Sequence, residues 1–343
     1  MKRTALAAAL LLSTSGVALA QSYDLNVVGS LSTSSLYPTY ELPFWTETLP
    51  AASGGRINVT VQAFDRLGLG GAAVYEMVEQ GVYDIGTTII DYVAGDEPRV
   101  EGLDIPAIAD PALAREISIA YRPYLERVFD EAFDSVLLGV APFTAQVVFC
   151  KAEINGLDDL AGLRIRGSGR MTMDFIEAVG GTGVSIAFNE VPVALDRGVI
   201  DCGITGTLSG FFGGWSEVST HFYPLPIGGW DPVGFAMNND SWNSLDEETQ
   251  TLLREQVAAL EDQIWNNAVA DNQLGIACNT GGECAVGTAQ NLTLVEITEA
   301  DQRRAVELTR DVVLPRWNER CAGECAETFA ATVAPLLDAV LTE

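Results

Sequence analysis

The sequence predicts an α/β protein with two similar lobes, each a mixed sheet flanked by helices, and a cleft between them. Residues 81–88 read GVYDIGTT and residues 198–205 read GVIDCGIT, so the pattern G-V-x-D-x-G-x-T occurs twice. Each copy follows an amphipathic helix candidate and leads into a strand, and an apolar strand candidate precedes each helix, INVTVQAF in one case and GVSIAF in the other. Two β-α-β units of like design predict two similar lobes, each a sheet with helices on its faces.

The remaining elements follow in chain order. In the first lobe, apolar runs predict the strands LNVVGS, INVTVQAF, DIGTTII and SVLLGVAP, and helical periodicity predicts helices over 38–52, 71–80 and 111–133. In the second lobe, the predicted strands are QVVFC, LRIRG, VSIAF and DCGITG. PVGFAMN, around 232–238, predicts a strand at which the chain crosses back to the first lobe.

The C-terminal part predicts a brace between the lobes. Ser244 and Glu247 form a predicted capping box for a long amphipathic helix that ends near Leu274. NLTLVEIT then predicts a strand, and residues 299–340 predict two helices. We therefore expect lobe 1 to comprise 22–145 plus about 231–272, and lobe 2 to comprise 146–230 plus about 273–343.

The N-terminus has the features of a signal peptide over residues 1–20. Lys2 and Arg3 precede an apolar run from Ala5 to Leu12, and Ala18-Leu19-Ala20 is a small-residue cleavage site before Gln21. The sequence predicts export to the periplasm. A lipid anchor is not expected, because no cysteine lies at the cleavage site. No later stretch has the roughly 18 consecutive apolar residues of a membrane span.

The charge excludes nucleic acid as a natural partner. The formal net charge of −28 becomes −30 once Lys2 and Arg3 are removed with the signal peptide. This excess of acid is typical of a solvated exterior. An anionic ligand remains compatible with it, because salt at about 0.15 M screens distant charges beyond roughly 8 Å and a buried arginine far less.

Six cysteines in an exported chain favour disulfides over metal. The simplest pairing joins Cys278 to Cys284 across a turn-rich loop and Cys321 to Cys325 near a helix junction, and cross-pairing among these four is the alternative. Cys150 and Cys202 lie on predicted strands of the second lobe, where a bridge and free buried thiols are about equally expected. A single histidine and the Cys-x-x-x-Cys spacing argue against a structural zinc site, and no metal or cofactor is expected.

One arginine stands out as a candidate ligand contact. Leu163 and Ile165 alternate with Arg164 and Arg166, so a short strand brings Arg166 to a Gly-rich turn ahead of a helix predicted from about Arg170 to Val179. Ligands of open α/β sheets bind at such strand ends. The alternative is that Arg166 only pairs with a surface carboxylate.

Several segments together resemble the solute-binding proteins of tripartite ATP-independent periplasmic (TRAP) transporters, the family typified by C4-dicarboxylate and sialic acid receptors. The resemblance spans most of residues 24–250. It is carried by SGGR before the strand INVTV, the pair Leu67-Gly68, the L-x-G-L-x-I-R segment at 160–166, and AFNEVPVALDRGVIDCG at 187–203.

The resemblance implies a periplasmic binding protein fold of type II with two α/β lobes that close over an organic anion. It also implies that Arg166 forms a salt bridge with the ligand carboxylate, and that Phe188 and Thr205 line the same pocket. Two departures affect the ligand: family members commonly have D-G-Q-E-N where this chain has DCGIT at 201–205, and some carry a second arginine where this chain has TAQV at 144–147.

Other candidates follow from their places beside strand ends and aromatic clusters. Rings near a carboxylate-binding arginine favour a ligand with an apolar body, such as an aromatic or keto acid, over a compact dicarboxylate. Hydroxyls of the run at 30–35 are further candidates. The candidate ligand-binding residues are Arg166, Phe188, Thr205, Thr88, Ser30, Tyr37, Trp215, Asn189 and Arg170.

Two other functions compete with solute transport. A hydrolytic enzyme is disfavoured, because the sequence has no G-x-S-x-G, H-E-x-x-H or P-loop motif, and a serine triad would depend on the lone His221. A sensor that signals through a membrane partner would share the same binding chemistry. The sequence thus predicts a solute-binding protein, monomeric, whose partners are a small organic anion and the membrane subunits of a TRAP transporter.

Overall fold

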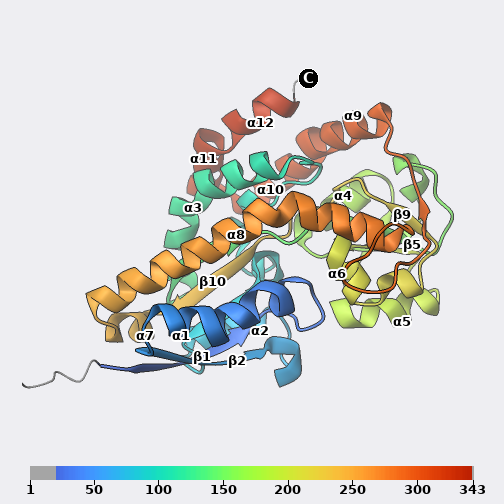
Figure 1. Ribbon diagram of the computed structural model, residues 1–343. Coiled ribbons are helices and arrows are strands. Elements are labelled where there is room, and N and C mark those ends of the chain that lie inside the picture. The colour runs from blue at the N-terminus through green and yellow to red at the C-terminus, as the bar shows by residue number, and fades with distance from the viewer. Residues whose placement is uncertain (1–20, 342–343) are drawn as a thin grey trace, which may run out of the picture.

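The computed structural model describes residues 21–341, and the predicted signal peptide at 1–20 lies outside this range. Two sheets organise the chain, which confirms the predicted two-lobed α/β class (Figure 1). Within the described residues, no helix is both long enough and apolar enough to cross a membrane.

The first sheet contains five strands in the order β2-β1-β3-β10-β4. β1 is parallel to β2 and β3, whereas β10 is antiparallel to both β3 and β4, as expected for a strand that returns from the other lobe. Their bounds are β1 Tyr23–Gly29, β2 Ile57–Ala63, β3 Ile85–Ile89, β4 Ser135–Ala141 and β10 Val233–Asn238.

Helices of the first lobe follow the predicted order. The segment predicted as 38–52 is one helical run of two π-helical parts and a short α-helix, and α3 has the predicted ends, with Asp110 as its N-cap. Their bounds are η1 Tyr37–Glu41, η2 Phe44–Thr48, α1 Leu49–Ala52, η3 Phe64–Leu67, α2 Ala73–Glu79, η4 Ile90–Val93, η5 Pro98–Leu103 and α3 Pro111–Phe133.

The second sheet contains six strands in the order β11-β9-β5-β8-β6-β7. β6 is parallel to β7 and β8, and β5 is antiparallel to β8 and β9. Their bounds are β5 Gln146–Cys150, β6 Arg164–Arg166, β7 Thr182–Val184, β8 Cys202–Gly206, β9 His221–Tyr223 and β11 Thr293–Leu294. The helical segments between them are η6 Leu157–Leu160, α4 Arg170–Ala178, η7 Phe188–Glu190, α5 Val191–Asp196, α6 Thr207–Phe212 and η8 Trp215–Glu217.

The repeated motif has the same geometry in both lobes. Gly81 follows α2 and Gly198 follows α5, and their φ angles of 67° and 65° are in the left-handed region that glycine adopts without a Cβ clash. The chain then enters β3 or β8, which carry Thr88 and Thr205 near their ends. The repeat therefore gives the two sheets equivalent helix-to-strand transitions.

The long helix α8 (Glu247–Asn279) connects the lobes (Figure 1). At its first half, Glu261 accepts a hydrogen bond from the backbone N–H of Val140 in β4 (3.2 Å). At its last turns, Asn279 donates to the carbonyl of Thr207 in α6 (2.9 Å). The predicted bracing role of this helix is confirmed, because one rigid element is bonded to both lobes.

Three details of the C-terminal third differ from the prediction. The N-cap of α8 is Asp246, which accepts from the Thr249 N–H at 2.7 Å, whereas Ser244 ends the short helix α7 (Asn239–Ser244) and bonds to Ser241. The predicted strand NLTLVEIT forms only the two residues of β11, because its edge position gives it one neighbour. The two helices predicted over 299–340 are instead the succession α9 Glu299–Leu308, η9 Thr309–Val313, α10 Leu314–Cys321, α11 Gly323–Thr332 and α12 Ala334–Leu341.

All six cysteines are paired as the sequence suggested. The bonds Cys278–Cys284 and Cys321–Cys325 are local, and Cys150 lies opposite Cys202 in the β5–β8 register, where these two residues form the third bridge.

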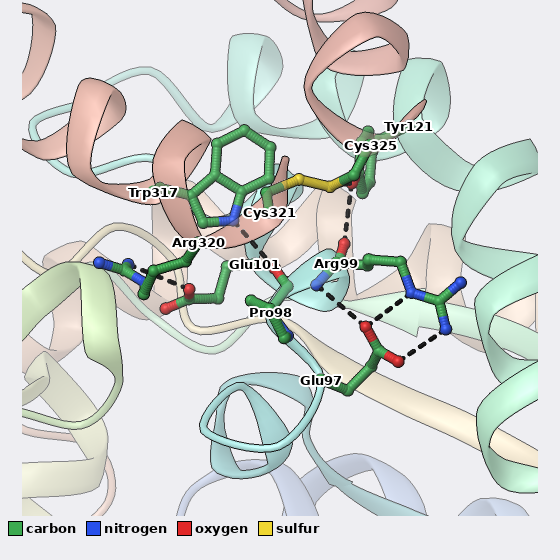
Figure 2. Close-up of a disulfide and its surroundings, with 9 residues drawn as sticks. All are labelled: Glu97, Pro98, Arg99, Glu101, Tyr121, Trp317, Arg320, Cys321 and Cys325. Atoms are coloured by element: carbon green, nitrogen blue, oxygen red, sulfur yellow. Dashed lines mark hydrogen bonds and ion pairs between the residues drawn. A yellow bond between two sulfur atoms is a disulfide. The ribbon is translucent and has the colours of Figure 1, made fainter. Parts of the chain in front are cut away.

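The Cys321–Cys325 bond lies between α10 and α11, where these helices pack on the first lobe (Figure 2). Trp317 donates its indole N–H to the carbonyl of Pro98 (2.9 Å), and Arg320 forms an ion pair with Glu101 (3.2 Å). The disulfide therefore stabilises the corner from which two C-terminal side chains reach η5.

Candidate functional site

Arg166 is the last residue of β6, between β7 and β8, and the Gly-rich turn after it leads into α4 at Arg170. Its neighbour Arg164 is exposed on the same strand and forms an ion pair with Asp201 (2.8 Å). Gly169 is needed in the turn because a Cβ there would lie 2.2 Å from an oxygen of Asp91. The local sequence thus sends one arginine to the surface and the other to the lobe interface.

The Arg166 side chain is 3% exposed and is held by backbone carbonyls. Its Nε donates to Ile186 O (3.1 Å) and its Nη1 to Ile204 O (2.9 Å), while its Cζ lies 5.6 Å from the ring centre of Trp215. Within the described part of the chain, this guanidinium has no carboxylate ion-pair partner. The surface ion pair is therefore made by Arg164, and Arg166 is left to bind an acceptor in the cavity.

A cavity of about 560 Å³ lies between the lobes at this arginine. The first lobe supplies residues of the β1 loop, the segment before α2, and η4, and the second lobe supplies the β6–α4 turn and the β7–η7 segment. The lining residues are Leu31, Phe64, Asp65, Leu69, Gly70, Gly71, Ala72, Asp91, Tyr92, Gly95, Arg166, Gly167, Ser168, Gly169, Arg170, Met173, Ser185, Ile186, Ala187, Phe188 and Asn189.

A second hollow, of about 700 Å³, lies elsewhere on the described surface, lined from the α3 region, the segment 224–226 after β9 and the C-terminal helices. Asp110 and Glu116 are its only charged lining residues, so nothing there would compensate the charge of an anion. The cavity at Arg166 is therefore the better candidate for an anion site.

Four of the predicted site residues line the cavity: Arg166, Arg170, Phe188 and Asn189. The Arg170 side chain is 47% exposed and pairs with Asp174 (3.3 Å), whereas Phe188 is buried and packs on Trp215 at 5.2 Å between ring centres. Asn189 accepts a hydrogen bond from the Thr33 hydroxyl of the first lobe (2.8 Å), so it bridges the two walls.

Two predicted residues lie directly behind the lining. Trp215 is fully buried, and its ring supports both Phe188 and the Arg166 guanidinium. Thr88 is also fully buried, and its hydroxyl would lie 3.1 Å from a Cβ at the lining residue Gly71. These two side chains are placed to support the walls.

The other three predicted residues are buried in the lobes and are absent from the lining. Thr205 lies in β8 opposite Val147. Ser30 and Tyr37 surround the buried carboxylate of Glu41, to which the Ser30 N–H donates (3.0 Å). Burial raises the pKa of Glu41 to about 7.

Sequence reasoning missed the side chains that the first lobe brings to the arginine. Asp91 and Tyr92 directly follow β3, so the strand-end rule that selected Arg166 would also have found them. The Tyr92 ring packs against the lining residue Gly71, where a Cβ would lie 2.1 Å from the ring. Burial raises the pKa of Tyr92 to about 12 although the Arg166 charge acts to lower it, which places the phenol in the field of the guanidinium.

The model of a known family matches residues 31–303 of this chain, and its description is bacterial extracellular solute-binding protein, family 7. The matched range contains every residue that lines the cavity.

Solved structures share the fold at low sequence identity. An extracytoplasmic solute receptor of Bordetella pertussis that binds pyroglutamic acid superposes with a TM-score of 0.79, 20% identity, and coverage of 90% of this chain and 99% of that one. A TRAP periplasmic solute-binding protein of Desulfovibrio salexigens with bound orotic acid superposes with a TM-score of 0.80 and 16% identity, over 92% of this chain and 99% of that one. A TRAP periplasmic solute-binding protein of Rhodoferax ferrireducens with bound malonate superposes with a TM-score of 0.79 and 16% identity, over 93% of this chain and 100% of that one.

Proposed function

Since the chain belongs to family 7 of the bacterial extracellular solute-binding proteins, we propose that it captures a small organic acid in the cavity at Arg166 and delivers it to the membrane subunits of a TRAP transporter. The family consists of solute-binding receptors, as the resemblance predicted. The observation that carries the proposal is a buried arginine in an interlobe cavity, anchored by two backbone carbonyls and without a carboxylate partner among the described residues.

The chemistry of the site supports a carboxylate ligand. Two hydrogen bonds to carbonyls fix the guanidinium plane in advance, so a carboxylate meets a preorganised donor and loses little entropy in orienting it. Phe188, Met173 and Leu69 contribute apolar side chains to the other walls, beside polar ones such as Asp65 and Asn189. These walls support an acid with a ring or an apolar body. Pyroglutamate, orotate and malonate, which the similar structures bind, are the first compounds to test.

The proposal includes the lobe division and export of the chain. Lobe 1 would comprise 22–145 and about 231–272, and lobe 2 would comprise 146–230 and about 273–343, since each group contains the strands of one sheet. Cleavage after Ala20 would release a monomeric receptor into the periplasm, the compartment in which this family works.

A thermal-shift screen of organic acids identifies the ligand, because a ligand that binds only the folded state at 100 times its dissociation constant adds about 2.7 kcal/mol of stability. Titration calorimetry then compares Arg166→Ala with the wild type. Loss of one partner of a buried, hydrogen-bonded charge pair costs about 2 to 5 kcal/mol, which predicts affinity weakened by roughly 30-fold or more. The affinity of Arg166→Lys should lie between those of the wild type and Arg166→Ala, because lysine cannot form two parallel hydrogen bonds to a carboxylate.

Arg164→Ala is the matched control, since Arg164 lies two residues earlier on the same strand and pairs with Asp201 at the surface. We expect its affinity to stay close to that of the wild type. A folded Arg166→Ala protein with wild-type affinity would remove the arginine from the site, and the absence of any stabilising carboxylate would contradict the proposed ligand class.

A further inference from the structure

Three buried aspartates converge where the first lobe meets the cavity. Asp91 belongs to η4 after β3, Asp104 directly follows η5, and Asp231 precedes β10. One carboxylate oxygen of each lies within 4.8 Å of the corresponding oxygens of the other two. Their exposed fractions are 4%, 4% and 3%, so water does not solvate these carboxylates in the usual way.

The oxygens of this group have few hydrogen-bond donors. Asp104 Oδ1 accepts from the backbone N–H groups of Trp230 (2.8 Å) and Asp231 (3.1 Å). Both oxygens of Asp91 and Oδ1 of Asp231 are buried without a hydrogen-bond partner among the described residues. A buried carboxylate oxygen that binds nothing is costly, so such a group calls for a cation or a proton.

Nearby arginines do not supply that cation. Glu101, a fourth buried acid in this region, is itself paired with Arg320 (3.2 Å) and accepts from the Met171 N–H (3.0 Å). Arg166 forms no ion pair with any of the three aspartates in the described part of the chain. The three aspartates therefore share a low-dielectric site without an ion-paired arginine or lysine in the described chain.

We propose that Asp91, Asp104 and Asp231 bind a divalent metal ion, and that Ca²⁺ is the ion that fits best. A donor set made only of carboxylate oxygens suits hard cations. Oxygens that bind one Ca²⁺ at 2.3–2.6 Å can lie up to about 4.6–5.2 Å apart, so three oxygens within 4.8 Å of one another can all reach the same ion. Mg²⁺ usually keeps several waters in a strict octahedron, and the unpartnered oxygens here are shielded from solvent.

The position of the group connects it with the anion site. Asp91 lines the cavity, and its Oδ2 lies against Gly169 in the turn that follows Arg166. Uncompensated aspartates on this wall would repel an anion, whereas a bound dication neutralises most of their charge. The metal site stands independently of the proposed organic-acid function, because metal alone can be titrated.

The test is calorimetric titration of CaCl₂ into the chelator-treated exported protein in 0.15 M NaCl, where diffuse binding to the acidic surface is screened. We expect one saturable site. Asp91→Asn and Asp231→Asn should each weaken Ca²⁺ binding at least tenfold, because each removes one of three charged ligands. Asp65→Asn is the matched control: Asp65 also lines the cavity, but its oxygens are bonded to Ser32, and its Ca²⁺ affinity should stay within about twofold.

The absence of saturable Ca²⁺ binding to the wild-type protein would overturn the proposal. This measurement does not depend on whether any variant folds. Wild-type Ca²⁺ affinity in folded Asp91→Asn and Asp231→Asn proteins would also overturn it, since binding would then reside on surface acids. Circular dichroism establishes folding of each variant.

Discussion

Single buried groups decide where charge is tolerated in this protein. Arg166 and Glu41 are both nearly inaccessible, and their surroundings differ: carbonyls accept hydrogen bonds from the arginine, whereas one oxygen of Glu41 accepts from Ser30 and the other is buried without a partner. The arginine is therefore oriented to receive an anion, whereas the surroundings of the glutamate favour its protonated form.

Glu41 makes the stability of the first lobe dependent on pH. Burial raises its pKa to about 7 from an ordinary value of 4.5, so the folded state binds this proton more tightly than the unfolded state. The stabilisation by this proton is complete below about pH 4.5 and is lost as the pH rises through about 7. We predict that Glu41→Gln is more stable than the wild type at pH 8 by about 3 kcal/mol, and that the difference vanishes near pH 4.

Urea unfolding of both proteins between pH 4 and pH 8 measures that difference directly, because the other acids contribute equally to each. The exposed Glu47→Gln is the control and should change stability little at any pH. A gap between Glu41→Gln and the wild type that is the same at every pH would contradict the assignment.

At the scale of elements, strand pairing and disulfides reinforce each other. The bond Cys150–Cys202 ties β5 to the adjacent strand β8, and its two cysteines are 52 positions apart in the sequence. The Cys278–Cys284 and Cys321–Cys325 bonds join cysteines only 6 and 4 positions apart. Because loop-closure entropy grows with loop length, the first bond constrains the unfolded chain most.

The double variant Cys150→Ala/Cys202→Ala should lose about 4 kcal/mol of unfolding free energy, and Cys278→Ala/Cys284→Ala about 2 kcal/mol. Denaturant unfolding under non-reducing conditions tests this order. The denatured, unreduced wild type should contain no reactive thiol. A larger loss from the short loop, or two free thiols in the wild type, would refute the account.

At the scale of the whole molecule, the cavity exists because two lobes face each other across crossovers that α8 braces. Thr33 of the first lobe donates to Asn189 of the second at 2.8 Å, a bond that joins the walls directly and that opening of the lobes would break. Its contribution belongs to the closed state alone, so it should slow release of the ligand.

Asn189→Ala is therefore expected to raise the ligand dissociation rate about fivefold, since a hydrogen bond of this kind contributes about 1 kcal/mol. Stopped-flow tryptophan fluorescence measures this rate. Asn58→Ala is the control, because Asn58 is also exposed and bonds only to Asp24 within the first sheet. An unchanged dissociation rate for Asn189→Ala would show that this bond does not hold the lobes closed.

The sequence by itself determined the elements and their order, since these follow from local chemistry. Alternating apolar residues, glycines with positive φ after two helices, and the strand before the Gly-rich turn predicted the five strands of the first sheet, α3, α4 and the position of Arg166. In the second sheet the prediction was incomplete: β9 was missed, and the predicted strand VSIAF shares only Val184 with β7. It also predicted the short disulfides, because their partners are neighbours in the chain.

Only the tertiary structure decided which side chains meet at the cavity. Asp91, Asp104 and Asp231 span 140 residues of chain, and no local pattern brings them together. Ser30 and Tyr37, chosen for their place after a strand, surround Glu41 instead, and Trp215 lies behind the wall. An apolar pattern with a period of two or 3.6 residues shows which face of a strand or helix is buried. The contacts across a lobe interface depend instead on how the whole lobes pack, and segments far apart in the chain determine that packing together.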